Sequence, residues 1–135
     1  MKTILSIRNL ILCLSTLFIF STSCISQNQD SKENKICIEK IKELYGSDTS
    51  LDGPLSITEV EKRNLVPIEK DGQKITVPFG FVNDKWLEIK AEMKKGDKIF
   101  EFSTGPDSWA HLAGRAGVIV LRGEFVVGTV ITTMN

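Results

Sequence analysis

One stretch near the C-terminus, GVIVLRGEFVVGTVITT (residues 117–133), sets the fold. Its first part, Val118 to Leu121, is apolar without a break, which is typical of a central strand covered on both faces. Gly123-Glu124 predicts a tight turn, and Phe125 to Thr133 is long enough to be the backbone of the sheet. We therefore expect an antiparallel strand pair at the centre of the domain.

A hairpin and a third strand precede this pair. Asp71-Gly72 is a strong hairpin cue because glycine accepts the positive φ of the turn, and it joins expected strands at Leu65 to Lys70 and Gln73 to Phe79. Pro78 lacks an N–H group and therefore belongs near a strand end or edge. Lys98 to Ser103 predicts a further strand, with its two phenylalanines on one face.

Three segments, residues 36–45, 83–93 and 106–113, have helical periodicity. The apolar stripes of the first two consist of Cys37, Ile41, Leu44 and Tyr45, and of Trp86, Ile89 and Met93. The Trp86 stripe is interpreted as core rather than as a ligand site. Gly46 and Gly96 are expected to end these two helices.

Two shorter segments complete the picture of the fold. Ser56 to Glu59 fits a capping box that opens a short helix, and residues 47–54 have the composition of a loop. The predicted class is α+β, with about five mostly antiparallel strands and two or three helices packed on one face.

The N-terminus has the layout of a secretory signal. Lys2 and Arg8 form a positive head, Leu10 to Phe20 is largely apolar, and Ser21-Thr22-Ser23 leads with small residues to Cys24. The Ser-Thr-Ser-Cys ending resembles the lipobox of bacterial lipoproteins. This resemblance implies that Cys24 carries lipid and becomes the mature N-terminus, although Ser21 stands where leucine is usual.

Two alternatives to a lipid anchor remain open. The apolar stretch is shorter than the roughly 20 residues that a transmembrane helix needs, so an uncleaved anchor is disfavoured. Ordinary secretion would follow if Cys24 were not lipidated, because Ser21 and Ser23 also suit a small-residue cleavage site. Ile25 after the cysteine favours the outer over the inner membrane if the lipoprotein rule applies.

The domain organisation follows from this reading. Residues 1–23 are expected to be the signal peptide, residues 24–35 a flexible tether, and residues 36–135 a single small α+β domain. Of 17 basic residues two leave with the signal, so 15 basic residues face 17 acidic ones. A near-neutral envelope domain gives no electrostatic case for binding nucleic acid.

The cysteines do not form a disulfide framework. Cys13 lies in the signal and Cys24 would carry lipid, so Cys37 is the one thiol expected in the domain. We expect Cys37 to pack as a small hydrophobe. The alternative is a redox or nucleophilic thiol.

The segment around the single histidine holds the candidate functional residues. If residues 106–113 are helical, Trp109 points to the core with Leu112 and Ala113, and Asp107 and His111 stack on the opposite face. Each charged residue then lies at the helix end that the dipole prefers, which explains both without a function. The functional alternative is an acid–base or anion-recognising site built from His111, Asp107 and Arg115.

Arg115 has two possible roles. Its guanidinium could bind a ligand carboxylate. The favoured interpretation is a structural ion pair with Glu101 on the preceding strand.

Residues 93–135 resemble a set of small uncharacterised bacterial proteins. The resemblance is carried by Gly96-Asp97, by Trp109-x-x-Leu-Ala-Gly-Arg-Ala-Gly117, by Arg122-Gly123 and by the closing Met134-Asn135. It implies a shared domain and carries no activity.

The pattern of motifs favours binding over catalysis. The chain has no Gly-x-Ser-x-Gly elbow, no His-Glu-x-x-His pair and no phosphate-loop motif, and a single histidine does not suit the usual zinc sites, so no metal or cofactor is expected. We expect a lipid-anchored envelope protein whose domain binds a partner, first of all a protein. The alternatives are a small hydrolase-like enzyme that uses His111 with Asp107 or Glu101, and an inhibitor or immunity lipoprotein.

Overall fold

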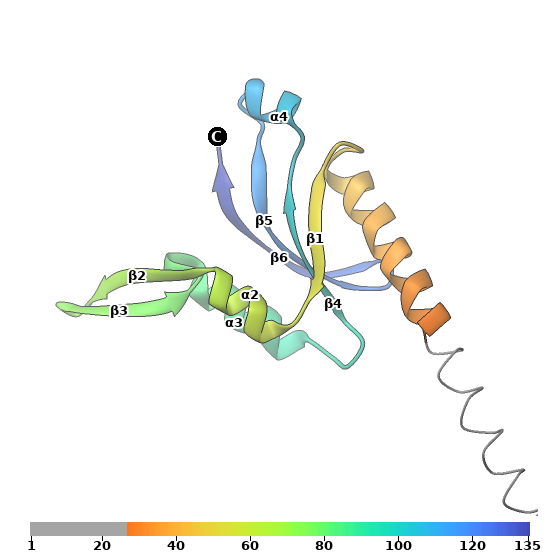
Figure 1. Ribbon diagram of the computed structural model, residues 1–135. Helices are drawn as coiled ribbons and strands as arrows, with labels where there is room; N and C mark the ends of the chain where they lie inside the picture. The colour runs from red at the N-terminus through yellow and green to blue at the C-terminus, as the bar shows by residue number, and fades with distance from the viewer. Residues whose placement is uncertain (1–26) are drawn as a thin grey trace, which may run out of the picture. The chain divides into compact units, whose positions relative to one another are not determined.

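The expected central strand is β5 (Arg115–Arg122), which lies inside a four-stranded antiparallel sheet of order β1-β4-β5-β6. The computed structural model describes residues 27–135 (Figure 1). The other three strands of this sheet are β1 (Ser50–Leu55), β4 (Lys98–Ser103) and β6 (Phe125–Met134). The strands β2 (Leu65–Lys70) and β3 (Gln73–Pro78) form a separate hairpin. The α+β class is confirmed, with six strands in the described part of the chain rather than five.

Both faces of the four-stranded sheet carry a core. Ile99, Val118 and Val120 face one cluster, and Phe100 and Ile119 face the other, because neighbouring residues of a strand point to opposite faces. The continuous apolar run of β5 is confirmed as a strand covered on both sides.

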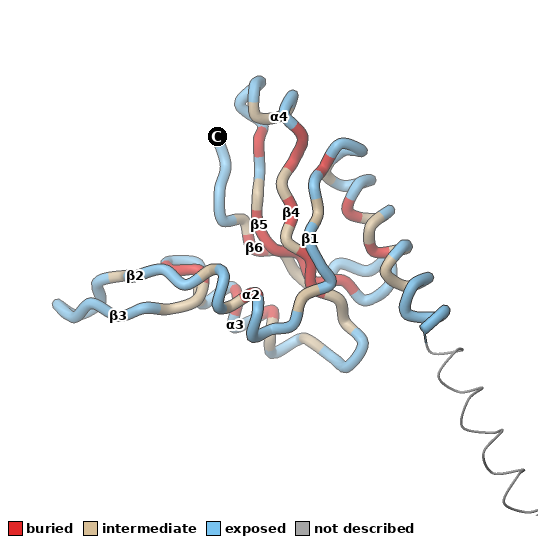
Figure 2. The backbone as a smooth tube through the Cα atoms, viewed as in Figure 1, coloured by how far each residue is buried: buried red, intermediate tan, exposed pale blue. Residues whose placement is uncertain are grey.

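Helices therefore lie on both faces, and the expectation that they pack on one face is wrong. Val60 of α2 (Ile57–Arg63) and Trp86 and Ile89 of α3 (Asn83–Glu92) belong to the first cluster. Cys37 and Ile41 of the N-terminal helix belong to the second. We call these clusters the α3 core and the N-terminal core. The distribution of buried residues along the strands is visible in Figure 2.

The N-terminal helix covers residues 27–45 of the described chain, so it includes residues 27–35, where a flexible tether was expected. The segment has no glycine or proline, and Lys35 pairs with Glu39 one turn later. Residues 34–135 form one compact unit. Within that unit Tyr45 stacks on Phe102, with ring centroids 4.2 Å apart.

Strand β1 was expected to be loop. Its residues pair with β4 in the register Ser50 with Ser103 and Asp52 with Glu101, and the register shifts between Asp52 and Leu55. Local composition favours a loop here because glycine and proline occur together. The ladder with β4 overrides that preference, which is why the strand count exceeds the prediction.

The capping box at Ser56 is confirmed and fixes the start of α2. The Ser56 hydroxyl accepts from the Glu59 backbone N–H, and the Glu59 carboxylate accepts from the Ser56 backbone N–H at 2.9 Å. One turn later, Glu61 joins α2 to α3: its carboxylate accepts from Trp86 Nε1 at 2.8 Å and from Lys90 Nζ at 2.6 Å. These bonds hold the two helices together over the α3 core.

The Gly96-Asp97 and Arg122-Gly123 motifs meet in one ion pair. Arg122 Nε and Nη2 each donate to a different carboxylate oxygen of Asp97 at 2.8 Å, the two-point geometry that makes such pairs strong. The Asp97 side chain is only 1% exposed and also accepts from the Lys94 backbone N–H. Because of Arg122, the pKa of Asp97 is lowered.

The hairpin forms as predicted and stands apart from the sheet. Asp71 and Gly72 have φ of 52° and 74°, so both turn residues adopt the left-handed conformation that the tight turn requires. Strands β2 and β3 pair in full register from Leu65 with Pro78 to Lys70 with Gln73. Figures 1 and 2 show the hairpin projecting from the domain with most of its length exposed. We call residues 65–78 the arm.

Candidate functional site

The helix that carries the candidate acid–base residues is short. It is α4 (Pro106–Ala110), and His111 is its C-cap. His111 Nδ1 lies 2.8 Å from the backbone carbonyl oxygen of Asp107 rather than against the carboxylate, and both residues are exposed. The structure therefore gives His111 a local capping contact and does not assemble an acid–base pair with Asp107.

Gly114 and Trp109 of this segment act in packing. Trp109 Nε1 donates to the Thr104 carbonyl at 3.0 Å, and a Cβ atom on Gly114 would lie 2.2 Å from the Trp109 ring. Asn135 ties the same place together: it donates to the Trp109 carbonyl and accepts from the Gly114 N–H. Leu112, expected in the core with Trp109, is instead 77% exposed because the helix ends before it.

The predicted ion pair between Arg115 and Glu101 is wrong. Arg115 is exposed, and its backbone rather than its guanidinium is held, by Thr104. Glu101 instead accepts from Arg63 Nη1 at 3.0 Å and from Asn64 Nδ2 at 2.9 Å. These two residues come from the end of α2, 37 and 38 positions away in the chain, so no local pattern pointed to them.

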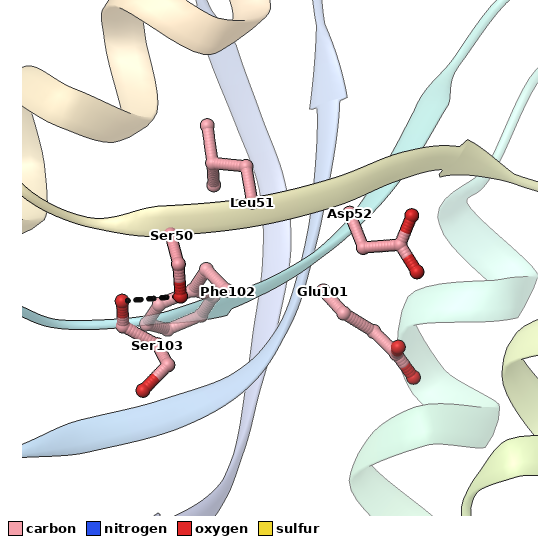
Figure 3. Close-up of a pocket in the computed structure, with 6 residues that line it drawn as sticks. All are labelled: Ser50, Leu51, Asp52, Glu101, Phe102 and Ser103. Carbon is pink, nitrogen blue, oxygen red and sulfur yellow. Dashed lines mark hydrogen bonds between the residues drawn. The ribbon is translucent and has the colours of Figure 1, made fainter.

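Glu101 and Asp52 share Arg63. The two acids lie opposite each other on β4 and β1, and Arg63 forms ion pairs with both carboxylates. Figure 3 shows the two carboxylates on the same side of the strand pair. Hydrogen bonds to Asp52 and then to Glu101 raise the pKa of Arg63.

These carboxylates border an open pocket of about 370 Å³. Its lining consists of Ser50, Leu51, Asp52, Glu101, Phe102 and Ser103 (Figure 3). The Ser50 hydroxyl is already engaged, since it donates to the Ser103 carbonyl at 3.3 Å. The pocket can accept hydrogen bonds from a polar ligand, but Arg63 already occupies the two acids.

Cys37 is confirmed as a core residue. Its side chain is fully buried among the residues of the N-terminal core, and Sγ lies 3.5 Å from the Gly123 carbonyl oxygen. A buried thiol in apolar surroundings is not placed to act as a nucleophile. Among residues 27–135 no group of three or more His, Cys, Asp or Glu side chains is arranged to hold a metal ion.

The feature that sequence reasoning missed is the exposed apolar surface at and beside the arm. Between residues 65 and 87, six large apolar side chains are exposed, half of all such side chains in the described part of the chain. They are Leu65, Val66, Ile75, Phe81, Val82 and Leu87. Phe81 is the most exposed, at 88%, and belongs to the 3-10 turn η1 (Gly80–Val82) that follows β3. The sequence signal was the alternation of Ile75, Val77 and Phe79 with Lys74, Thr76 and Pro78, which gives this strand one apolar face.

The base of the arm is anchored firmly. Phe79 lies in the α3 core with its ring centroid 4.9 Å from that of Trp86, and its N–H donates to the Asn64 carbonyl at 2.7 Å. Asn83 Nδ2 donates to the Pro78 carbonyl at 2.8 Å. The arm therefore leaves the domain in a defined direction although its own surface is exposed.

No family model, curated protein or solved structure matches the chain. In residues 27–135 no helix has the length and apolar character needed to cross a membrane. The proposed signal peptide and Cys24 lie outside the described residues.

Proposed function

We propose that this chain is an envelope lipoprotein, anchored by lipid on Cys24, whose domain binds a protein partner without catalysing a reaction. The anchor is supported by the layout of residues 1–24. The observation that carries the binding function is the group of exposed apolar side chains on residues 65–87, with Phe81 at 88% exposure. Large apolar side chains that stay exposed along one segment of a folded chain mark it as a candidate interaction site.

The enzyme alternative has less support. Its residues would be His111 with Asp107 or Glu101, and His111 contacts a backbone carbonyl while Glu101 is engaged by Arg63 and Asn64. A general base needs a partner within hydrogen-bonding reach in a site that can hold a substrate. No contact of His111 favours that role over capping, so we do not propose a second function.

Two phenylalanines provide a matched test of the binding surface. Phe81 and Phe125 are exposed to similar degrees, 88% and 78%, but Phe125 begins β6 in the sheet. A photo-reactive phenylalanine analogue is placed at either position in the full chain and irradiated in its native envelope. We expect a discrete cross-linked protein from position 81 that reacts with the same stoichiometry in repeated preparations, and none from position 125.

Excess unlabelled wild-type protein should abolish the cross-link from position 81, whereas the same excess of unlabelled Phe81→Ser should leave it largely intact. Equal cross-linking from both positions would reject this surface as the binding site. The anchor is tested separately by metabolic labelling with palmitate, which should label wild type and not Cys24→Ser. An unlabelled wild-type chain would reject the lipid anchor and leave the secreted alternative.

A further inference from the structure

The two edges of the arm differ in their free backbone groups. Lys70 and Gln73 flank a two-residue turn, so they form a hydrogen-bonded pair, and pairs alternate along the ladder from there. Pro67 and Thr76 consequently form a non-hydrogen-bonded pair, whose backbone N–H and C=O positions face away from the hairpin. Pro67 and Pro78, which have no N–H, both fall at non-hydrogen-bonded positions, where the ladder needs no donor from them.

This alternation leaves one edge open and one edge interrupted. On β2, the row of backbone N–H and C=O groups that point away from the hairpin (its outer row) includes Pro67. Because proline has no N–H, this row lacks a donor in the middle of the strand. The outer row of β3 presents the N–H and C=O groups of Lys74 and Thr76, both exposed. Outside the β2–β3 ladder, neither residue makes a backbone hydrogen bond to another of residues 27–135, whereas the Pro78 carbonyl is already used by Asn83.

The arm also has an incomplete apolar face. Val66 and Val77 face each other across the ladder, and Ile68 and Ile75 form the next pair on the same side. Val66 and Ile75 remain 39% and 37% exposed. A two-stranded hairpin alone is marginally stable in water, and a third strand is the usual way to complete it.

We propose that the outer edge of β3 binds an extended, antiparallel strand of a partner protein. This inference rests on the proposed partner-binding function and names its mode. The added strand would bond to the backbone of Lys74 and Thr76 and place apolar side chains beside Ile75 and Val77. Lys74 is the only charged residue of β3, and an acidic residue in the added strand would lie opposite it on the outer edge, as Glu69 of β2 does on the inner edge.

A peptide probe follows from the arm itself. Strand β2 has this pattern, with Val66 and Ile68 beside Val77 and Ile75 and with Glu69 opposite Lys74. On the outer edge, however, the residue in the place of Pro67 must donate to the Thr76 carbonyl. The probe is therefore a blocked hexapeptide of the β2 sequence carrying Pro67→Thr, and the control is the same hexapeptide with its proline retained.

Binding is measured by NMR titration of the full chain, ¹⁵N-labelled in detergent micelles. We expect the amide signals of Lys74 and Thr76 to shift and to gain exchange protection, while the amide of Ile75, which bonds to β2, stays unchanged. The peptide that retains proline should bind about fivefold more weakly, the effect of one lost hydrogen bond.

Two proline variants of the protein form a matched pair. Thr76→Pro removes an outward N–H from β3, and Glu69→Pro removes an outward N–H from β2, and neither residue contributes an N–H to the ladder between them. We expect Thr76→Pro to weaken binding by at least about fivefold, the effect of one lost hydrogen bond, and Glu69→Pro to retain it, with the amide signals of the four-stranded sheet unchanged in both variants.

Three outcomes of the peptide experiments would overturn the proposal. These are an equal loss of peptide binding in the two proline variants, a shift of the Ile75 amide signal in place of those of Lys74 and Thr76, and failure of the probe peptide to bind at all. Concentration-dependent shifts of the same amides without peptide would overturn it in favour of a second copy of this chain. A cross-link from position 81 that persists after such a failure would show that the proposed function stands and that the partner uses another surface.

Discussion

At the scale of single residues, partners distant in the sequence determine which charges matter. Arg63 serves both Asp52 and Glu101, whereas Arg115, which has the more suggestive sequence context, is exposed. Removing Arg63 would leave two carboxylates opposite each other without their shared cation, and like charges in that position are destabilising.

Arg63→Met should therefore lower the free energy of unfolding at pH 7, by a modest amount because the pair is largely exposed. Arg115→Met is the matched control and should change it by less than about 0.5 kcal/mol. Urea denaturation measures both. A larger decrease in the free energy of unfolding for Arg115→Met than for Arg63→Met would contradict this prediction and favour the structural ion pair between Arg115 and Glu101.

The acid dependence of stability follows from Asp97 and Glu61. The pKa of Asp97 is lowered by Arg122 and that of Glu61 by Lys90 and Trp86. A lowered folded-state pKa stabilises the protein above the unfolded value and loses that contribution as pH falls through the folded value. Denaturation should thus show stability falling as the pH drops below about 5 and continuing to fall below the ordinary carboxyl pKa values.

Asp97→Asn should cost about 2 kcal/mol at neutral pH, since it breaks a two-point pair with a buried oxygen, and should flatten this acid limb. Glu88→Gln is the control, because Glu88 pairs only with Lys85 on the surface of α3. If the free energy of unfolding of Asp97→Asn fell at low pH by as much as that of wild type, Asp97 would not be a source of the acid dependence.

At the scale of elements, the arm and the sheet should differ in local stability. Strand β5 is bonded on both edges and covered on both faces, whereas the arm has two strands and an exposed surface. Local opening requires less free energy where few apolar contacts are broken.

Native-state hydrogen exchange should therefore show faster exchange at the inward amides of Ile68 and Ile75 than at those of Ile119 and Val120. We expect the difference to exceed about tenfold in rate, which corresponds to about 1.4 kcal/mol in opening free energy. Equal protection would mean that the arm opens only with the whole domain.

At the scale of the whole domain, one sheet joins the two cores, so they should unfold together. Ile41 lies in the N-terminal core and is fully buried, whereas Leu44 on the same helix is 47% exposed. A large-to-small change in a packed core removes both transfer free energy and packing contacts.

Ile41→Ala should lower the free energy of unfolding by about 3 kcal/mol, and Leu44→Ala by less than about 1 kcal/mol. The fluorescence of Trp86, which belongs to the α3 core, should follow the same transition as far-UV circular dichroism in both variants. Separate transitions would show that the two cores unfold independently.

Local patterns in the sequence determined a large part of this structure. The Asp71-Gly72 turn, the capping box at Ser56, the stripe of Trp86 and Ile89 and the doubly apolar β5 were all predicted, because turn conformation, capping and periodicity depend on residues close together in the chain. The burial of Cys37 followed from the same periodicity.

Contacts between residues far apart in the chain followed from tertiary packing and not from local patterns. Strand β1 exists because β4 supplies its partners, and Glu101 binds Arg63 rather than Arg115 because α2 ends beside β4. The projection of the arm was also invisible in the sequence: alternation shows that a strand has an apolar face, but only packing shows whether the domain covers it. The candidate binding surface depends on that last distinction, since the same apolar residues would have been core under a different placement of the hairpin.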